Sequence, residues 1–337
     1  MSTTTNHHLV VTQAGVFSPP IQFTAPPGIK LTQEHFKDIT PDQLHERIHK
    51  ASIIVSCWTR LDSVALSEAV TPNLKFIAVT AVGTDSVDLA TCQRRGILVS
   101  NCPAANVESV SNHAMALYFA ARRNVVQMDR VVKDGVWHKE GPSVALRMKD
   151  SNQGLGLTSE EETVGIIGFG SVGKKVAQLS KGLGMKVLIA GRKGQNETTK
   201  KGDIERTPFE DVLKRSTVLI IAVPRVPETM NLISTAEFQA MSADTVLINI
   251  SRGGIVDEAA LLQALKEKSI FGAATDVFET EPASAATSPL LAEDTRNLNL
   301  TTSPHLAWYA NKTMKNYLTI SPSNVHNFLL GKPTNLV

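Results

Sequence analysis

The sequence predicts an α/β protein of two domains, each built around a parallel β-sheet. The chain has 337 residues, more than a single apolar core usually organises. Short β-branched runs alternate with segments of helical periodicity, and one such run leads into a glycine-rich turn at residues 168–173. We therefore expect one doubly wound Rossmann sheet and a smaller, flavodoxin-like α/β domain.

The amino-terminal third of the chain predicts the smaller domain. Strands are expected at 53–55, 76–79 and 97–99, with helices at 41–50 and 87–95 between them. The chain then continues with apolar residues at helical spacing, which predict one long helix or a kinked pair over 109–132. Residues 141–162 are polar and glycine-rich without periodicity, and they predict a loop or an arm.

The remainder of the chain predicts the doubly wound sheet. Amphipathic helices separate five strand candidates, which are 164–168, 187–190, 218–223, 246–250 and 273–277. Two helices have sequence signals for their first turn, because Thr207 and Ser234 each precede a carboxylate by three residues, and Pro208 suits the first helical position. The tail from 313 to 330 predicts a helix interrupted at Ser321-Pro322, which could pack on either domain.

Composition and charge exclude several classes of partner. Hydrophobic residues make up 42% of the chain and charged residues 20%, which is typical of a globular protein. Lys and Arg number 34 against 32 Asp and Glu, so no global positive field attracts nucleic acid or an anionic membrane. Any anion must therefore be bound by local charges.

Cysteine usage and the amino terminus predict a cytoplasmic protein. Cys57, Cys92 and Cys102 are an odd number without C-x-x-C spacing, so neither a disulfide framework nor a metal site is expected. Residues 1–11 lack the basic segment and apolar run of a signal peptide, and no stretch approaches the ~20 apolar residues of a membrane span.

The glycine-rich turn has the form G-x-G-x-x-G between a strand and a helix. Gly168 permits a tight turn, Gly170 lets the backbone approach a pyrophosphate, and Gly173 lets helix and strand pack closely. The amino end of the helix supplies unpaired N–H groups and a positive dipole. A turn without a ligand is the alternative, but the surrounding βα units favour a dinucleotide site.

The residues after the second strand of this unit predict the choice of dinucleotide. An NAD-specific site carries Asp or Glu there to bind the adenosine ribose, whereas this strand ends in Arg192 and Lys193. An Arg fork matches a phosphate, and the adjacent Lys adds a second positive charge. We therefore expect NADP to be preferred, with NAD possible if these residues form only a solvated basic turn.

Three polar residues follow later strands, at the sheet edge where open α/β sheets bind ligands. They are Arg252 in S-R-G-G, Glu281 in D-V-F-E-T-E-P and His305 in S-P-H. Reduction of a 2-oxo acid needs a cation that holds the carboxylate and polarises the carbonyl, and a donor that protonates the oxygen. Each residue alone is more often structural, but together behind the dinucleotide fingerprint they predict a catalytic group.

At these motifs the sequence resembles the D-isomer-specific 2-hydroxyacid dehydrogenases over nearly the whole chain, including V-G-T-D-S-V-D at residues 82–88. The resemblance implies that Arg252 orients and polarises the substrate, that His305 donates or accepts the proton, and that Glu281 bonds His305 and raises its affinity for that proton. Asn112-His113 departs from the Glu-His of many relatives.

The resemblance also implies further contacts. The backbone at Val82 and Gly83 is expected to bind the substrate carboxylate, and Trp58 either walls the substrate pocket or belongs to the core. Asp276 is expected to contact the nicotinamide carboxamide. The full set of expected cofactor-binding residues is Gly168, Phe169, Gly170, Ser171, Val172, Gly173, Arg192, Lys193, Val223, Pro224, Thr229, Ile250 and Asp276.

The family builds its substrate domain from both ends of the chain. Residues 1–107 and 308–337 are therefore expected to form that domain, and residues 108–307 the dinucleotide-binding domain, with a dimerisation arm near 135–162. The implied function is reduction of a small 2-oxo acid to the D-2-hydroxy acid, with glyoxylate, hydroxypyruvate or a 2-keto sugar acid as leading substrates. The alternative is a dinucleotide-dependent, corepressor-like binding protein, since Glu281 argues against the formate dehydrogenases, which carry Gln there.

Overall fold

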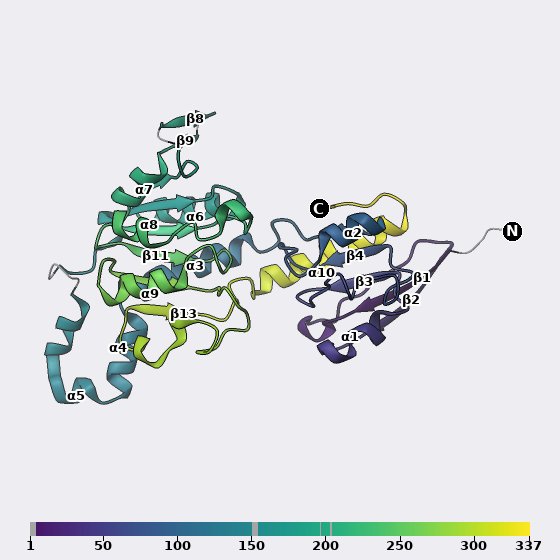
Figure 1. Ribbon diagram of the computed structural model, residues 1–337, viewed down its shortest axis with the longest axis horizontal. Coiled ribbons are helices and arrows are strands. Elements are labelled where there is room, and N and C mark those ends of the chain that lie inside the picture. The colour runs from purple at the N-terminus through teal and green to yellow at the C-terminus, as the bar shows by residue number, and fades with distance from the viewer. Residues whose placement is uncertain (1–4, 150–153, 196, 203) are drawn as a thin grey trace. The chain divides into compact units, whose positions relative to one another are not determined.

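A computed structural model describes residues 5–149, 154–195, 197–202 and 204–337. The chain divides into two compact units. The first consists of Met1–Asn106 and Tyr309–Val337, and the second of Val107–Trp308. Each unit contains its own parallel sheet (Figure 1), so the predicted α/β class is confirmed. None of the helices in the described ranges is long and apolar enough to cross a membrane.

The first unit contains a five-stranded parallel sheet in the order β2-β1-β3-β4-β5. Its strands are β1 Thr5–Val11, β2 Ile29–His35, β3 Ile53–Ser56, β4 Phe76–Val79 and β5 Leu98–Ser100. This is the flavodoxin-like order that the fold class predicts. The sequence signals for β1 and β2 are weak, because β1 begins with the polar run Thr5-Asn6-His7-His8 and β2 is an edge strand with mostly exposed side chains.

The helices of the first unit are α1 Pro41–Ile48, α2 Leu89–Arg95 and α10 Asn311–Leu329. The tail therefore packs on this unit, where Phe328 stacks on Phe76 of β4 with ring centroids 4.4 Å apart. The predicted interruption at Ser321-Pro322 is wrong, since α10 runs through Pro322. Buried contacts hold the helix together there, including a hydrogen bond of 2.9 Å between the hydroxyls of Ser321 and Thr80.

The second unit contains a six-stranded parallel sheet in the order β13-β12-β11-β10-β6-β7. Its strands are β6 Thr163–Ile167, β7 Lys186–Ile189, β10 Val218–Ile221, β11 Val246–Asn249, β12 Gly272–Thr275 and β13 Leu300–Thr302. The first five were predicted. The sixth, β13, has only three residues, which is too short for a sequence signal. Strand order reverses between β6 and β10, the position where doubly wound sheets bind ligands.

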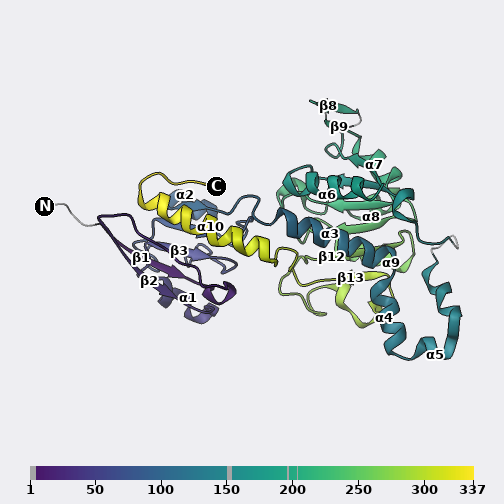
Figure 2. The same ribbon diagram turned by 180° about the vertical axis from the view of Figure 1, so that it is seen from behind.

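Helices cover both faces of this sheet. The helices α3 Val107–Arg122 and α6 Ser171–Gly182 pack on one face, while α7 Phe209–Arg215, α8 Thr235–Ala240 and α9 Glu258–Lys266 pack on the other (Figures 1 and 2). Successive strand residues alternate between the two cores, as in β10, where Val218 joins the α3–α6 core and Leu219 the α7–α9 core.

The helical segment after the first unit is the kinked pair rather than one helix. It breaks at Asn124, which has a left-handed backbone with φ 50°, and resumes as α4 Val125–Lys133. The short α5 Val136–Glu140 and a 3-10 helix at Gly141–Met148 follow. Part of the predicted arm, residues 150–153, lies outside the described residues.

The two predicted helix starts have different outcomes. The helix α8 begins after Ser234, whose N–H donates to the Glu237 carboxylate at 3.0 Å, as expected. The prediction for Thr207 is wrong, because α7 begins two residues later with Pro208 as its cap. Thr207 instead continues the sheet, where its N–H donates to the Ile189 carbonyl at 2.8 Å.

A buried ion pair joins several elements at the amino ends of the strands. Arg122 and Glu162 are 1% and 0% exposed, and Arg122 Nε donates to the Glu162 carboxylate at 2.6 Å. The same guanidinium donates to the carbonyls of Thr217 and Asp244 and lies over the ring of Phe271. One side chain thus links α3 to the segments that precede β6, β10, β11 and β12.

Candidate active site

The glycine-rich turn lies at the carboxyl end of β6, and α6 begins in it. Gly168 has φ +96°, and a Cβ there would overlap the Ala222 carbonyl. A Cβ at Gly173 would overlap the Gly168 carbonyl, so both positions require glycine for packing alone. Gly170 differs, because a Cβ there meets no atom within 4 Å. Open space beside a helix amino end fits a dinucleotide pyrophosphate.

The basic residues after β7 have unequal surroundings. The Lys193 ammonium contacts the Glu237 carboxylate at 2.7 Å, so a residue of its own chain balances its charge. Arg192 is exposed, and its backbone N–H contacts Gln195 at 3.4 Å. A third cation, Arg206, donates to the carbonyl of Ala190 at 3.1 Å.

Arg206 was not predicted because it belongs to a hairpin that the sequence analysis did not identify. The antiparallel hairpin of β8 Thr199–Lys201 and β9 Ile204–Arg206 lies between β7 and α7 (Figure 1). An isolated parallel bridge between Ala190 and Thr207 then brings the end of the hairpin beside the end of β7.

The loops after β10 and β11 contain the next expected cofactor residues. Val223 and Pro224 follow β10, and the Thr229 hydroxyl donates to the Pro224 carbonyl at 2.7 Å. Ile250 is buried after β11, and the hydroxyl of Ser251 donates to the Val223 carbonyl. These bonds fix two neighbouring loops at the strand ends.

Arg252 follows β11 in a loop that packs tightly against the end of β12. A Cβ at Gly253 would overlap the backbone of Phe278, which explains the glycine after Arg252. Gly254 has φ +77°, a conformation that favours glycine. The loop is thereby held beside the segment that contains Glu281, and Arg252 donates from Nη1 to the Ser251 carbonyl at 2.8 Å.

Glu281 and His305 form a direct pair. His305 Nδ1 and Glu281 Oε2 are 2.6 Å apart, and the other carboxylate oxygen accepts the Phe278 N–H at 2.9 Å. The side chains are 37% and 33% exposed, so both remain accessible from outside the unit. With Nδ1 bonded to the carboxylate, Nε2 is the ring nitrogen left to exchange a proton with a substrate.

The surroundings of Glu281 keep it ionised. Burial raises the pKa of this carboxyl, but hydrogen bonds from His305 and the Phe278 N–H, with the positive charges of His305 and Arg252, lower the pKa below its ordinary value. Arg252 is therefore near enough to Glu281 to lower the pKa of that carboxyl. The structure therefore assembles an imidazole, a carboxylate and a guanidinium at the carboxyl ends of β11, β12 and β13.

Asp276 holds the backbone around His305. Its carboxylate accepts the N–H groups of Leu306 and Ala307 at 3.0 and 2.9 Å, and its carbonyl accepts the His305 N–H at 2.7 Å. Burial raises the pKa of Asp276, but hydrogen bonds from His113, Ser303 and these N–H groups outweigh it, so the pKa is lowered. Asp276 is only 1% exposed. Its hydrogen bonds fix the loop in which His305 has φ +53°.

His113 and Ser303 are site residues that sequence reasoning did not single out. His113 Nε2 lies 2.9 Å from the Ser303 hydroxyl and 3.4 Å from Asp276 Oδ1. The Ser303 hydroxyl donates to the same oxygen at 2.6 Å. Both residues belong to motifs noted in the sequence, Asn112-His113 and S-P-H, but only the fold shows that they converge on Asp276.

The expected substrate contacts Trp58, Val82 and Gly83 belong to the first unit. Trp58 follows β3 and is 49% exposed, which excludes the core alternative. Val82 and Gly83 lie in the loop after β4, where the Val82 carbonyl accepts the side-chain amide of Asn101 at 2.7 Å. Both sets of predicted substrate residues, in the first unit and the second, thus follow the carboxyl ends of parallel strands.

Sequence comparison identifies relatives over most of the chain. Residues 115–307 match the D-isomer specific 2-hydroxyacid dehydrogenase, NAD binding domain. A glyoxylate reductase of Pyrococcus furiosus is 36% identical over 264 residues, 76% of each chain. A glycerate dehydrogenase of Methylorubrum extorquens is 35% identical over 305 residues, 90% of this chain and 91% of the relative.

Structural comparison agrees with the sequence comparison. An NADPH-dependent glyoxylate/hydroxypyruvate reductase of Sinorhizobium meliloti, solved with NADP and malonate, is similar to this chain with a TM-score of 0.74 and 25% identity. The similarity covers 98% of this chain and 96% of that one. With its Rossmann sheet, its glycine fingerprint and the Arg252–Glu281–His305 group, the chain belongs to the D-isomer-specific 2-hydroxyacid dehydrogenases and binds a nicotinamide dinucleotide.

Proposed function

We propose that the protein reduces a small 2-oxo acid to the D-2-hydroxy acid with NADPH, and that glyoxylate or hydroxypyruvate is its leading substrate. A 2-keto sugar acid is the next candidate. The observation that carries the proposal is the 2.6 Å contact between His305 Nδ1 and the Glu281 carboxylate, next to Arg252. The names of the glyoxylate reductase and glycerate dehydrogenase relatives support this substrate class.

Each residue of the group has a defined task in this reaction. A nicotinamide dinucleotide held at the glycine-rich turn would supply the hydride for the carbonyl carbon. Arg252 holds the substrate carboxylate and polarises the carbonyl, because a guanidinium fork matches a carboxylate. His305 delivers a proton from Nε2 to the carbonyl oxygen, while Glu281 stabilises the imidazolium through Nδ1. The backbone at Val82 and Gly83 and the exposed ring of Trp58 are proposed as the remaining substrate contacts.

A panel of substrates tests this function. The wild-type enzyme is assayed with NADPH and NADH against glyoxylate, hydroxypyruvate, 2-keto-D-gluconate and phenylpyruvate. His305→Ala is expected to lower kcat roughly 100-fold or more, with NADPH affinity retained, because it removes only the proton donor. Absence of turnover on every 2-oxo acid by the wild type would overturn the proposal and favour a dinucleotide-dependent binding protein.

We also propose that NADP is preferred over NAD and that Arg192 and Arg206 bind the 2'-phosphate. No carboxylate follows β7 in the position that would bind the adenosine ribose. Arg206 is bonded to the carbonyl of Ala190, two residues before Arg192, so its guanidinium lies at the end of β7 that Arg192 follows. Lys193 contributes less than expected, because Glu237 balances its charge.

Three substitutions test the cofactor proposal. Arg192→Asp is expected to reverse the preference, since it removes a charged hydrogen bond of ~1.5 to 3 kcal/mol and so raises the NADPH KM roughly 10-fold to 150-fold. Arg206→Gln should raise the NADPH KM without changing the NADH KM. Lys193→Gln is the matched control and should change neither by much. An unchanged NADPH to NADH ratio of kcat/KM in Arg192→Asp would contradict the proposal.

We further propose that the protein acts in the cytoplasm as a homodimer assembled through the arm near residues 135–162. Cys57, Cys92 and Cys102 are all free thiols, which suits a reducing compartment. Large apolar side chains are exposed along α4 and the arm, at Val125, Val132, Trp137, Leu146 and Leu155. A run of exposed apolar residues of this kind is typical of a surface covered by a second copy of the chain.

A further inference from the structure

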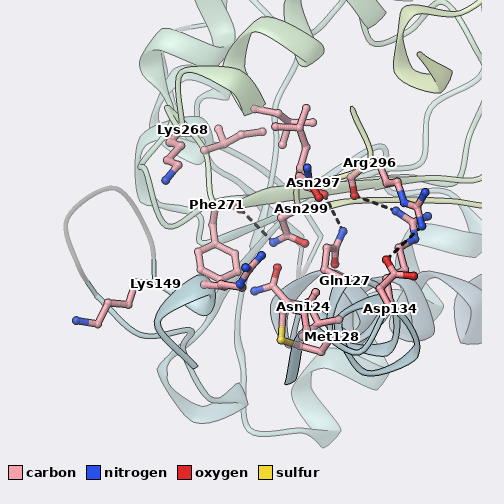
Figure 3. A pocket seen from close by; sticks show the side chains of 17 residues that line it. Asn124, Gln127, Met128, Asp134, Lys149, Lys268, Phe271, Arg296, Asn297 and Asn299 are labelled. Carbon is pink, nitrogen blue, oxygen red and sulfur yellow. Dashed lines mark hydrogen bonds and ion pairs between the residues drawn. The ribbon is translucent and has the colours of Figure 1, made fainter. Parts of the chain in front are cut away.

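The strand β13 leads into the segment that contains His305, yet it has only three residues and stands at the edge of its sheet. Side-chain bonds to α3 and α4 fix its amino end. Gln127 of α4 donates from Nε2 to the Leu298 carbonyl at 2.8 Å (Figure 3). Asn299, just before the strand, donates from Nδ2 to the Ala121 carbonyl of α3 at 2.9 Å. The helices therefore supply bonds that a second neighbouring strand would otherwise provide.

The helix α3 also holds the segment after β13, residues 303–308. His113 Nε2 lies 2.9 Å from the Ser303 hydroxyl. One helical turn earlier, the Ser109 hydroxyl donates to the Trp308 carbonyl at 3.3 Å. Residues four apart share one face of a helix. This face of α3 thus contacts both ends of the segment that has His305 in its middle.

The direction of the hydrogen bonds at Ser303 follows from the charge of Asp276. The pKa of Asp276 is lowered, so its carboxylate is ionised and can only accept. The Ser303 hydroxyl has one hydrogen, which it donates to Asp276 Oδ1 at 2.6 Å. The Ser303 oxygen is then the acceptor for His113, so we assign a hydrogen to Nε2 of His113.

Asp276 and Trp308 connect this arrangement to His305. The Asp276 carbonyl accepts the His305 N–H at 2.7 Å, and Trp308 Nε1 donates to the His305 carbonyl at 2.9 Å. Both backbone groups of His305 are therefore bonded to residues that are themselves held by α3. These bonds maintain the left-handed backbone of His305, which is strained for a residue with a Cβ.

We propose that His113 is a positioning residue, which holds the backbone of His305 so that the imidazole stays on Glu281 and presents Nε2 to the substrate. It acts through the Ser303 hydroxyl and the Asp276 carboxylate rather than by contact with the reacting atoms. The effect on turnover rests on the proposed function, whereas the contact of His305 with Glu281 can be measured without it. The His113 side chain is 26% exposed, so a polar replacement need not disturb the apolar core.

Two substitutions at position 113 differ by one methylene. Gln places its amide nitrogen near the position of Nε2 of the imidazole, whereas Asn is too short to reach Ser303. His113→Asn is expected to lower kcat roughly 10-fold or more on the 2-oxo acid that the wild type reduces fastest, because a displaced proton donor slows the chemical step. The KM for that acid should change less than about 3-fold, since Arg252 still holds the carboxylate.

His113→Gln restores the donor and should keep kcat within about 3-fold of the wild type. His45→Gln is the matched control, because His45 is exposed on α1 of the first unit, and it should change neither constant. An equal loss of kcat in the Gln and Asn variants, or a KM that rises as much as kcat falls in His113→Asn, overturns the proposal.

Crystal structures of the same two variants test the positioning without turnover. The distance between His305 Nδ1 and Glu281 Oε2 should stay near 2.6 Å in His113→Gln. In His113→Asn it should exceed about 3.5 Å, beyond the length of a hydrogen bond. An intact contact in His113→Asn overturns the proposal. A wild type that reduces none of the acids refutes the proposed function instead, and these distances then decide the role of His113 by themselves.

Discussion

His305 has a left-handed backbone, with φ +53°, which residues with a Cβ seldom adopt. Asp276 keeps it there through three backbone N–H groups, those of His305, Leu306 and Ala307. A residue-scale prediction follows from this conformation. His305→Gly should be more stable than His305→Ala by about 1 kcal/mol, because only glycine adopts this φ without strain.

Urea unfolding of the two variants measures this difference, and the loss of the imidazole is common to both. Neither variant has the His305–Glu281 bond, so a difference in their stability reports the backbone conformation at position 305. Equal stability, or a more stable Ala variant, would show that the loop relaxes once the imidazole is gone.

Glu281 provides a second prediction at this scale, through its lowered pKa. Glu281→Gln should reduce kcat at neutral pH roughly 10-fold to 100-fold and move the pH profile of reduction toward lower pH, since the charge that stabilises the imidazolium is lost. A lowered pKa means that Glu281 stabilises the fold fully above its ordinary value of 4.5 and loses this effect as pH falls through the folded value.

Denaturant unfolding of wild type and Glu281→Gln at pH 7 and pH 3 shows whether Glu281 stabilises the fold more at neutral pH than at acidic pH. The wild type should be the more stable protein at pH 7, and the difference should shrink at pH 3. A difference that grows on acidification, or a pH profile of turnover that does not move, contradicts the assigned role.

At the scale of the elements, the turn between β6 and α6 contains glycines with two different roles. Gly173 is needed for packing, and Gly170 is proposed to leave room for the pyrophosphate. Gly173→Ala should lower Tm, because its Cβ would overlap the Gly168 carbonyl and push α6 from the sheet. Gly170→Ala should leave Tm nearly unchanged, since its Cβ has open space, yet weaken dinucleotide binding roughly 10-fold or more by blocking the approach of the pyrophosphate.

Thermal melts and NADPH titrations of both variants distinguish packing from ligand contact. If Gly170→Ala bound NADPH as tightly as the wild type, the pyrophosphate would not approach this turn. Both variants are needed, because a loss of NADPH binding in Gly173→Ala alone could come either from disturbed packing or from a lost contact with the pyrophosphate.

Element prediction from the sequence succeeded where a strand is a run of apolar residues, including the edge strand β7, and failed where a strand is polar or very short. Buried runs such as β10 and β11 consist of apolar residues and were found. The half-polar β1, the edge strand β2 and the three-residue β13 have no such pattern. Thr207 shows a different limit, because sheet pairing with Ala190 overrides a local capping signal.

At the scale of the whole molecule, the exposed apolar residues of the arm predict assembly. Trp137→Ser/Leu146→Ser should convert the proposed dimer into a monomer in sedimentation velocity, because both side chains are more than half exposed in the single chain. Val64→Ser is the control, since Val64 is equally exposed but belongs to the first unit. A dimer that persists in the double variant would place the interface elsewhere.

The candidate site as a whole shows what a single sequence can reveal. Arg252, Glu281 and His305 were predicted as a group because each stands in a motif after a strand, and the structure places His305 beside Glu281. The pairing of Lys193 with Glu237 was hidden, because 44 positions separate the two residues in sequence and only the fold joins them. Arg206 was missed for another reason, since its hairpin has no recognisable sequence pattern.

The buried pair of Arg122 and Glu162 restricts how this sequence can diverge. Replacing either residue alone leaves an unbalanced interior charge at a cost of about 3–5 kcal/mol, a large share of the stability of most domains. Replacing both together with apolar side chains removes the charge imbalance and costs less, although the carbonyls of Thr217 and Asp244 then lose their donor. The two residues must therefore change together during evolution. We expect relatives to have both charged side chains or neither.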